Sequence, residues 1–373
     1  KHIYNVDMRS DGFTVFKLAF NKNKKSIFIV DEASMISAFG SSFSKNGFQS
    51  PDQGILNDLF SFVMNGNENK LLIIGDPAQL PPVNFNESPA LSMSYLEKEY
   101  NLEVKEYTLR EIMRQDKDSG ILYNAGEVRN NIEDQILEWP ELEYSLFSDF
   151  IKPQAFDIQD IIRDAFSSKL DESIIVTVSN KMANKYNNFI RSQVLNKENI
   201  IDGGDIVMCV KNNYFWQYSD DSEFIANGEM MMIKSVRNFE TKYNLNFADA
   251  TVKLLHQKDE PELDLKIIID TLNSNSPALP YSQYIELINS VIEEKGGRKT
   301  KKLMKEIVTQ NPYVNALQLK YAWALTCHKA QGGQWDNVFI DTEFLMKKEP
   351  DISALRWLYT AITRAKTKLV IMR

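Results

Sequence analysis

The chain has 373 residues, which is too long for one ordinary domain, so two or three domains with separate cores are expected. Its 43% hydrophobic and 25% charged residues are typical of a globular protein, and no apolar run approaches the roughly 20 residues that cross a bilayer, which argues against a membrane protein. The net charge of -8 argues mildly against nucleic-acid binding but does not exclude it, because a basic groove can be local.

The first third of the chain alternates between predicted strands and a predicted helix. Residues 26–30 (SIFIV) and 71–74 (LLII) are short apolar runs that lead into acidic residues, and residues 52–64 have apolar side chains at helical spacing. Such alternation predicts a parallel sheet, whose ligands gather at the carboxyl ends of the strands. Both runs would therefore place acidic residues at the same edge.

A second α/β segment follows it. A helix is predicted at residues 158–170, a strand rich in β-branched residues at 174–178, and a second helix at 182–194. Asn180 stands where the N-cap of that second helix belongs. This alternation of helices and strand predicts a second parallel sheet.

The pattern of predicted secondary structure changes between residues 200 and 315. Short predicted strands are separated by Asn, Gly and Asp turns, which indicates a small β-barrel, with strands at residues 205–210, 229–236 and 250–255. Two helices are predicted within this region, at residues 284–294 and 299–308. After residue 315 the chain again alternates between predicted strands, at 338–340 and 369–372, and a predicted helix at 354–364.

The cysteines and histidines do not form a metal-binding pattern. Cys209 and Cys327 lie far apart, at no disulfide or metal spacing, and they suit a reducing compartment, so a cytoplasmic location is expected. The histidines are scattered as well, at His2, His256 and His328.

The first predicted strand ends in a motif that suits nucleotide hydrolysis. Residues 27–35 read IFIVDEASM, and in P-loop motors an aspartate at the place of Asp31 holds Mg²⁺ while a glutamate at the place of Glu32 orients or deprotonates the attacking water. The alternative interpretation is a strand end with two solvated acids, because Asp-Glu alone is a weak signal.

The second predicted strand ends in residues 75–83, GDPAQLPPV. Gln79 could hydrogen-bond a γ-phosphate or the lytic water, and Asp76 lies in the same turn. Pro81 and Pro82 would keep the following segment extended. A turn that simply ends in proline is the alternative.

These two motifs, in this order, resemble motifs II and III of superfamily 1 helicases of the RecD-like, 5′-to-3′ branch. The rest of the chain continues the likeness: residues 109–115 (LREIMRQ) resemble motif IV, 325–336 (LTCHKAQGGQWD) motif V and 358–365 (LYTAITRA) motif VI. Residues 176–191 resemble the segment that touches the DNA backbone in this branch, and residues 205–214 with 227–229 resemble the start of its SH3-like insertion. Residues 257–315 match nothing in the family pattern.

The resemblance implies an α/β fold of two RecA-like P-loop NTPase lobes with parallel sheets, the second interrupted by a β-rich, SH3-like insertion with helices. The first lobe would comprise residues 1–107, the second lobe residues 108–199 with 316–373, and the insertion residues 200–315. It also implies ATP and Mg²⁺ as cofactors, with Asp31 as the metal ligand.

Site residues follow from the resemblance in three groups. Catalytic roles fall to Glu32, Gln79, Arg114 and Arg364, the two arginines placing positive charge on the γ-phosphate. Nucleotide contacts fall to Asp31, Asp76, Gln331, Gly332 and Gln334. DNA-backbone contacts fall to Thr177, Asn180, Thr326, His328 and Lys329.

Each of these residues also has an ordinary interpretation. A lone arginine is usually a surface salt bridge, a lone histidine is usually packed, and the motif context favours function here. The aromatic residues of 214–218 (Tyr214, Phe215, Trp216 and Tyr218) suggest base stacking, but their alternation favours core packing. The basic stretch 298–305 could equally be a solvated helix face.

Two departures from the family pattern stand out. Gln334 occupies a position where the branch commonly has glutamate, and an amide can still hydrogen-bond there. The sequence contains no G-x-x-x-x-G-K-[ST] loop, although residues 1–4 (KHIY) resemble the tail of the turn that follows that loop in the family. The expectation is a chain truncated at its N-terminus, without the backbone N–H cradle for the phosphates.

The resemblance implies an ATP-dependent DNA helicase or translocase acting on single-stranded DNA and duplex junctions, in DNA repair or recombination, with this fragment inactive alone. A non-catalytic DNA-binding or regulatory protein on a decayed helicase scaffold is the rival hypothesis. A third is a helicase subunit that works with nuclease or other recombination subunits of an exodeoxyribonuclease complex. No cluster of metal-binding carboxylates beyond Asp31 and Glu32 supports a nuclease in this chain itself.

Overall fold

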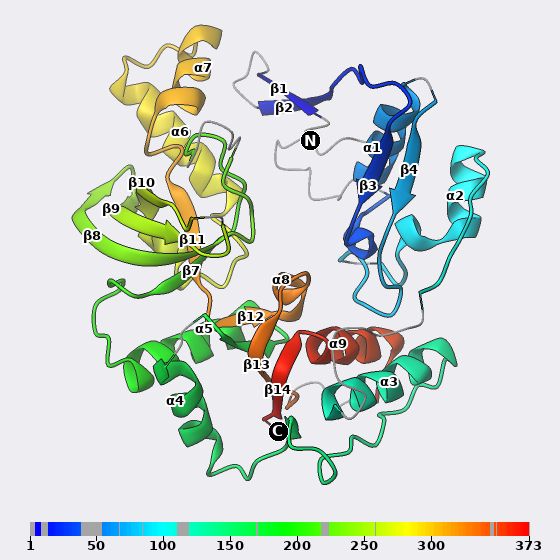
Figure 1. The fold of residues 1–373 in the computed structure, drawn as a ribbon. Helices are drawn as coiled ribbons and strands as arrows, with labels where there is room; N and C mark the ends of the chain where they lie inside the picture. The colour runs from blue at the N-terminus through cyan, green and yellow to red at the C-terminus, as the bar shows by residue number, and fades with distance from the viewer. Residues whose placement is uncertain are drawn as a thin grey trace. The chain divides into compact units, whose positions relative to one another are not determined.

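A computed structural model describes most of the chain (Figure 1). The described residues are 4–8, 14–38, 54–66, 68–83, 85–109, 119–168, 171–217, 224–257, 259–343, 347 and 349–372. They form two compact units: residues 1–117, 122–142 and 349–360 belong to the first, and residues 118–121, 143–348 and 361–373 to the second.

A parallel pair of strands is the centre of the first unit. β3 (Ile27–Val30) and β4 (Lys70–Ile73) run side by side, in register from Ile27 opposite Lys70 to Val30 opposite Ile73. The helix α1 (Ile55–Met64) packs on one face of the pair, where its Leu59, Phe62 and Val63 contact Phe28, Val30 and Leu71. The strand–helix–strand prediction for this region is confirmed.

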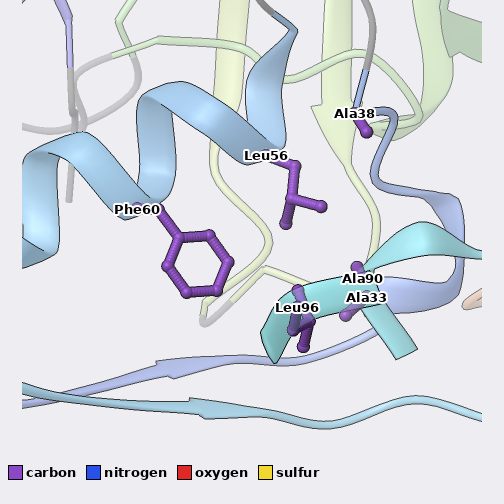
Figure 2. Packing of buried hydrophobic residues seen from close by; sticks show 6 residues of the cluster. All are labelled: Ala33, Ala38, Leu56, Phe60, Ala90 and Leu96. Carbon is purple, nitrogen blue, oxygen red and sulfur yellow. The ribbon is translucent and has the colours of Figure 1, made fainter. Parts of the chain in front are cut away.

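A second apolar cluster joins α1 to the segments after the two strands. Figure 2 shows Leu56 and Phe60 pointing from α1 toward Ala33, Ala90 and Leu96. Ala33 belongs to the short helix η1 (Ala33–Met35) after β3, and Ala90 and Leu96 follow β4. This packing fixes the chain just beyond the carboxyl ends of both strands. The remaining elements of the unit are β1 (Tyr4–Met8), β2 (Thr14–Leu18), η3 (Pro89–Leu91), α2 (Met93–Tyr100), most of α3 (Gly120–Glu133) and most of α9 (Ile352–Ile362).

The opposite face of the β3–β4 pair is exposed. Ile27 and Ile29 are 67% and 65% exposed, and Leu72 and Ile74 are 48% and 41% exposed. These residues alternate with half-buried ones along β3, β4 and the residue after β4, so all four lie on one face. Parallel sheets are normally covered on both faces, which makes this bare apolar face unusual.

The second unit contains a five-stranded sheet whose described pairings are all parallel. The strand order is β12 (Ala324–Thr326), β6 (Ser173–Thr177), β13 (Trp335–Ile340), β14 (Ala365–Ile371) and β5 (Phe150–Ile151). Every residue of β6 is buried, which explains its continuous apolar sequence. The predicted strands and the second parallel sheet are confirmed.

Two helices flank β6 in sequence: α4 (Ile158–Ser168) and α5 (Asn180–Phe189), which continues as a π-helical turn at Ile190–Val194. The N-cap prediction for α5 was wrong by one residue. Ser179, and not Asn180, accepts the hydrogen bond from the Met182 amide at 3.3 Å. Either side chain can cap a helix, and the extended backbone at Ser179 selects it.

A closed five-stranded barrel confirms the small barrel expected between residues 200 and 315, but its bound at residue 315 was too early, because β11 at Leu317–Tyr321 is one of the barrel strands. Its order is β10 (Glu262–Ile268), β11 (Leu317–Tyr321), β7 (Ile206–Cys209), β8 (Met230–Lys242) and β9 (Leu245–Leu254). The helices α6 (Tyr281–Glu294) and α7 (Lys301–Gln310) lie between β10 and β11 in the chain, as predicted. The short helix α8 (Cys327–Ala330) follows β12 in the chain.

A buried ion pair joins the end of α5 to the start of the barrel. Asp205 is fully buried, and its carboxylate accepts from Arg191 Nε at 3.2 Å and Nη2 at 3.1 Å. Lys197 Nζ lies 2.7 Å from the same carboxylate, and the Asp202 amide donates to it at 2.8 Å. The Arg191 guanidinium also lies 4.7 Å from the ring centre of Tyr321. The charge of Asp205 is therefore fully compensated inside the fold.

Replacing Asp205→Asn should lower the free energy of unfolding by about 3–5 kcal/mol, because it leaves Arg191 buried without its counter-charge. The matched control is Asp160→Asn, which removes an exposed partner of Arg163 and should cost less than about 1 kcal/mol. Urea unfolding of the 373-residue chain, followed by circular dichroism, measures both. Equal losses for the two variants would contradict the structural role given to Asp205.

Candidate functional site

The chain turns sharply where β3 ends. Asp31 and Glu32 are both exposed there, and Asp31 Oδ1 accepts a hydrogen bond from the Glu32 amide at 2.9 Å. Glu32 has a left-handed backbone conformation, with φ 52°, which is uncommon for a residue other than glycine. The next amide, of Ala33, donates to the carbonyl of Ile74 at 2.9 Å. The turn thus presents two carboxylates to solvent at the carboxyl edge of the strand pair, as predicted.

A second turn follows β4 at the same edge. Asp76 accepts from the Ala78 amide at 3.0 Å through Oδ1, and its carbonyl accepts from the Gln79 amide at 3.1 Å. Because β3 and β4 are parallel neighbours, this turn and the Asp31–Glu32 turn leave the sheet on one side. The structure therefore brings Asp31, Glu32, Asp76 and Gln79 to one edge of one unit.

The carboxylate of Asp76 is bound by side chains that the sequence did not single out. Arg129 Nη1 donates to its Oδ1 at 3.0 Å, and the Tyr359 hydroxyl donates to its Oδ2 at 2.8 Å. Arg129 Nη1 also donates to the Tyr359 oxygen at 2.9 Å. These protein groups are the partners that the structure shows for Asp76, and its contact with nucleotide stays a prediction. Tyr359 lies within the LYTAITRA motif, whereas no sequence signal marked Arg129.

Of the two predicted arginines, only Arg364 is placed. Arg114 lies outside the described residues. Arg364 belongs to the second unit and is 2% exposed; its Nη1 donates to the Gly333 carbonyl at 3.1 Å and its Nη2 to Thr363 Oγ1 at 3.0 Å. The carbonyl of Arg364 accepts from the Trp335 amide at 3.0 Å. Motifs V and VI are thus held together.

The motif V loop has an open stretch of backbone at Gly332. Its φ is +83°, and a Cβ added there would meet nothing within 4 Å, so another molecule could approach the backbone closely. Gln331 and Gln334 flank this glycine and are half-buried, in the same unit as Arg364. The three predicted nucleotide contacts of motif V are therefore adjacent and partly accessible.

The predicted DNA contacts separate into two sets. Thr177 is fully buried in β6, and its hydroxyl donates to the carbonyls of Ser179 at 3.1 Å and Leu325 at 3.3 Å, so it holds two strand ends together. Asn180, Thr326 and Lys329 line one pocket between α5, β12 and the barrel. The pocket lining also includes residues that the sequence analysis missed, among them Asn184 and Lys320.

Burial lowers the pKa of three basic groups in this part of the second unit. Lys320 is 7% exposed, and burial, reinforced by the nearby Lys329, lowers its pKa to about 8. Burial also lowers the pKa of Lys329, whose Nζ donates to Asn227 Oδ1 at 2.6 Å. The pKa of His328 lies below its ordinary value for the same reason. A charged lysine in an apolar strand such as LQLKY is the signal that could have identified Lys320.

Other expectations concern aromatic and metal sites. Tyr214 is 44% exposed and stacks on Phe224, so it is not a core residue, and Tyr218 lies outside the described residues. Trp216 donates its indole N–H to the Asn315 carbonyl at 2.9 Å. Among the described residues, no group of three or more His, Cys, Asp or Glu side chains could hold a metal ion. The described helices are all too short or too polar to cross a membrane.

Comparison with known proteins finds a similarity to a helicase domain in the last part of the chain. Residues 321–372 match the UvrD-like helicase C-terminal domain. An uncharacterized protein, R530 of Acanthamoeba polyphaga mimivirus, is 23% identical over 420 residues, covering 97% of this chain and 78% of the relative. Among solved structures, the chain is similar to a Pif1 helicase from Bacteroides in complex with ADP-AlF3 and ssDNA (15% identity, TM-score 0.48, 93% of this chain and 70% of that one). It is also similar to Pif1 from Candida albicans (16% identity, TM-score 0.43, 93% and 72%).

The half-buried His328 should make stability depend on pH. Because its folded pKa lies below the ordinary 6.5, the unfolded chain binds more protons as the pH falls through that value, and the free energy of unfolding should decrease. Urea unfolding between pH 7.5 and pH 5.5 should show a shallower decrease for His328→Gln than for the wild type. The control His256→Gln, at an exposed residue, should keep the wild-type slope. Identical slopes in all three proteins would show that His328 is not held neutral.

Proposed function

We propose that this chain is part of an ATP-dependent DNA helicase that translocates on single-stranded DNA, of the RecD-like branch of superfamily 1. The observation that supports this most is the single sheet edge that presents Asp31 and Glu32 after β3 and Gln79 after the parallel strand β4. The match of residues 321–372, which include Arg364, to a helicase domain supports the same proposal. A role in DNA repair or recombination, in the cytoplasm, is part of the proposal.

Each residue at the edge has a role that suits its position. Asp31 is exposed and would hold Mg²⁺, which needs only one or two protein carboxylates when phosphates and water complete its shell. Bound Mg²⁺ and ATP supply the reacting phosphate and the charge that polarises it. Glu32 would orient and deprotonate the attacking water, and Gln79 would hydrogen-bond that water or the γ-phosphate. Arg364 and Arg114 would compensate the negative charge that develops.

We propose that the phosphate-binding loop lies on a segment outside this chain. The donor set is incomplete as it stands, because the sequence contains no G-x-x-x-x-G-K-[ST] loop. The bare face of the β3–β4 pair supports the same proposal, since Ile27, Ile29, Leu72 and Ile74 are exposed where a parallel sheet is normally covered. A segment that supplied both the loop and a covering layer would complete the first lobe.

The division expected from the sequence stays a proposal, except that β11 (Leu317–Tyr321), which it gave to the second lobe, is a strand of the barrel. The first RecA-like lobe would comprise residues 1–107, the second residues 108–199 with 316–373, and an SH3-like insertion residues 200–315. Asn180, Thr326, His328 and Lys329 would contact the DNA backbone beside the pocket of the second unit. Single-stranded DNA and duplex junctions are the proposed partners, with nuclease or recombination subunits as further ones.

The 373-residue chain alone should show no ATP hydrolysis stimulated by single-stranded DNA, because it lacks a phosphate cradle. Extending it with the residues encoded immediately upstream should restore turnover. A coupled ATPase assay with and without oligonucleotide measures both proteins, and the Glu32→Gln form of the extended protein controls for contaminating ATPase. Turnover by the short chain would overturn the fragment proposal. An inactive extended protein that still binds DNA would favour the non-catalytic rival.

In the extended protein, Glu32→Gln should lower kcat for ATP by about 100-fold or more, because the amide cannot accept the proton of the attacking water. The affinity for ATP should stay within about 2-fold of the wild type, since Glu32 acts on the water and not on the nucleotide. Glu97→Gln, on the exposed side of α2, is the matched control and should not change either value. Unaltered turnover in Glu32→Gln would remove this residue from its role.

A further inference from the structure

The segment 76–80, here called the Gln79 loop, is held at both ends by consecutive residues of one helix. Tyr359 of α9 binds the carboxylate of Asp76 at the start of the loop, and Thr360 binds the amide of Leu80 at its end. Gln79 is the residue immediately before the second of these anchors. All of these residues belong to the first unit.

The first anchor is a closed triangle of three side chains. Asp76 Oδ2 accepts from the Tyr359 hydroxyl at 2.8 Å, Asp76 Oδ1 accepts from Arg129 Nη1 at 3.0 Å, and the same Nη1 donates to the Tyr359 oxygen at 2.9 Å. The Tyr359 hydroxyl therefore both donates and accepts, which fixes its orientation. Arg129 Nε also donates a hydrogen bond to Glu133, one turn further along α3, at 2.7 Å, and this hydrogen bond orients the guanidinium.

The protonation states in this triangle suit their roles at neutral pH. Burial, followed by the negative charge of Asp76, raises the pKa of Tyr359 to about 12, so its hydroxyl keeps the proton that it donates. Burial alone would lower the pKa of Arg129, but the Asp76 charge outweighs it and the pKa is raised. The triangle is therefore a stable charged contact at neutral pH.

The second anchor is a buried hydrogen bond. The Leu80 amide donates to Thr360 Oγ1 at 3.0 Å, and Thr360 is fully buried. Pro81 and Pro82 follow and are buried as well, so the loop cannot move outward at this end without exposing them. Two fixed points four residues apart leave little freedom for the backbone at Gln79.

We propose that Tyr359, Thr360 and Arg129 are positioning residues that hold Gln79 in place for ATP hydrolysis, an inference that rests on the proposed function. They act through the Gln79 loop and have no contact of their own with nucleotide. The chain leaves α9 and reaches Arg364 two residues after the end of the helix.

The anchors can be tested in the 373-residue chain without any enzymatic activity. Thr360→Val removes the acceptor of the Leu80 amide with little change of shape, and should speed hydrogen exchange of that amide by about 5-fold or more. Tyr359→Phe removes only the hydroxyl and should speed exchange at Gln79 and Leu80. Tyr107→Phe, at an 84% exposed tyrosine, is the matched control and should leave both amides unchanged. Unchanged exchange in both test variants would overturn the inference.

The catalytic part is tested in the extended protein by steady-state ATPase. Tyr359→Phe and Thr360→Val should each lower kcat by about 3- to 10-fold, with KM for ATP within about 2-fold. Combined with Gln79→Ala, neither should lower kcat further, because the loss already includes the residue through which they act. If the kcat losses of the single variants multiplied in the double variants, Tyr359 and Thr360 would act independently of Gln79. That result would overturn this inference and leave the proposed function intact. A wild-type extended protein without ATPase would instead overturn the proposed function, and the catalytic part of the inference with it.

Discussion

The parallel pairing of β3 with β4 is the constraint on which the candidate site depends. Four residue pairs set the register, from Ile27 opposite Lys70 to Val30 opposite Ile73. This register places the Asp31–Glu32 turn beside the Gln79 loop. Just beyond the ends of the two strands, the Ala33 amide donates a hydrogen bond to the carbonyl of Ile74. A slip of one residue would turn Phe28 and Val30 away from α1, so burial of that face also secures the edge.

The second unit holds two lysines away from bulk solvent, although the chain as a whole has an excess of acidic residues. Lys320 and Lys329 lie beside one pocket, half-buried or buried, and burial lowers the pKa of both. Partly desolvated ammonium groups gain more from an anionic partner than fully hydrated ones do, because the surrounding dielectric is lower. The net charge of -8 therefore describes the outer surface and gives no measure of this pocket.

Features governed by local periodicity could be predicted from the sequence, and features governed by distant contacts could not. The strand β6 and the helices α6 and α7 follow from apolar spacing, because burial leaves that pattern in the sequence. The partners of Asp76 lie 53 and 283 residues away, at Arg129 and Tyr359, and no spacing rule connects them. The cap of α5 was missed by one residue since Ser179 and Asn180 are both good capping residues.

The bare apolar face has a consequence for how the chain behaves in solution. Ile27, Ile29, Leu72 and Ile74 form a flat aliphatic surface, and within the described residues neither β3 nor β4 pairs with a further strand. Open strand edges beside exposed isoleucine are a template for self-association. The chain should therefore aggregate readily even though its folded core is well buried, and its tendency to aggregate should rise with concentration.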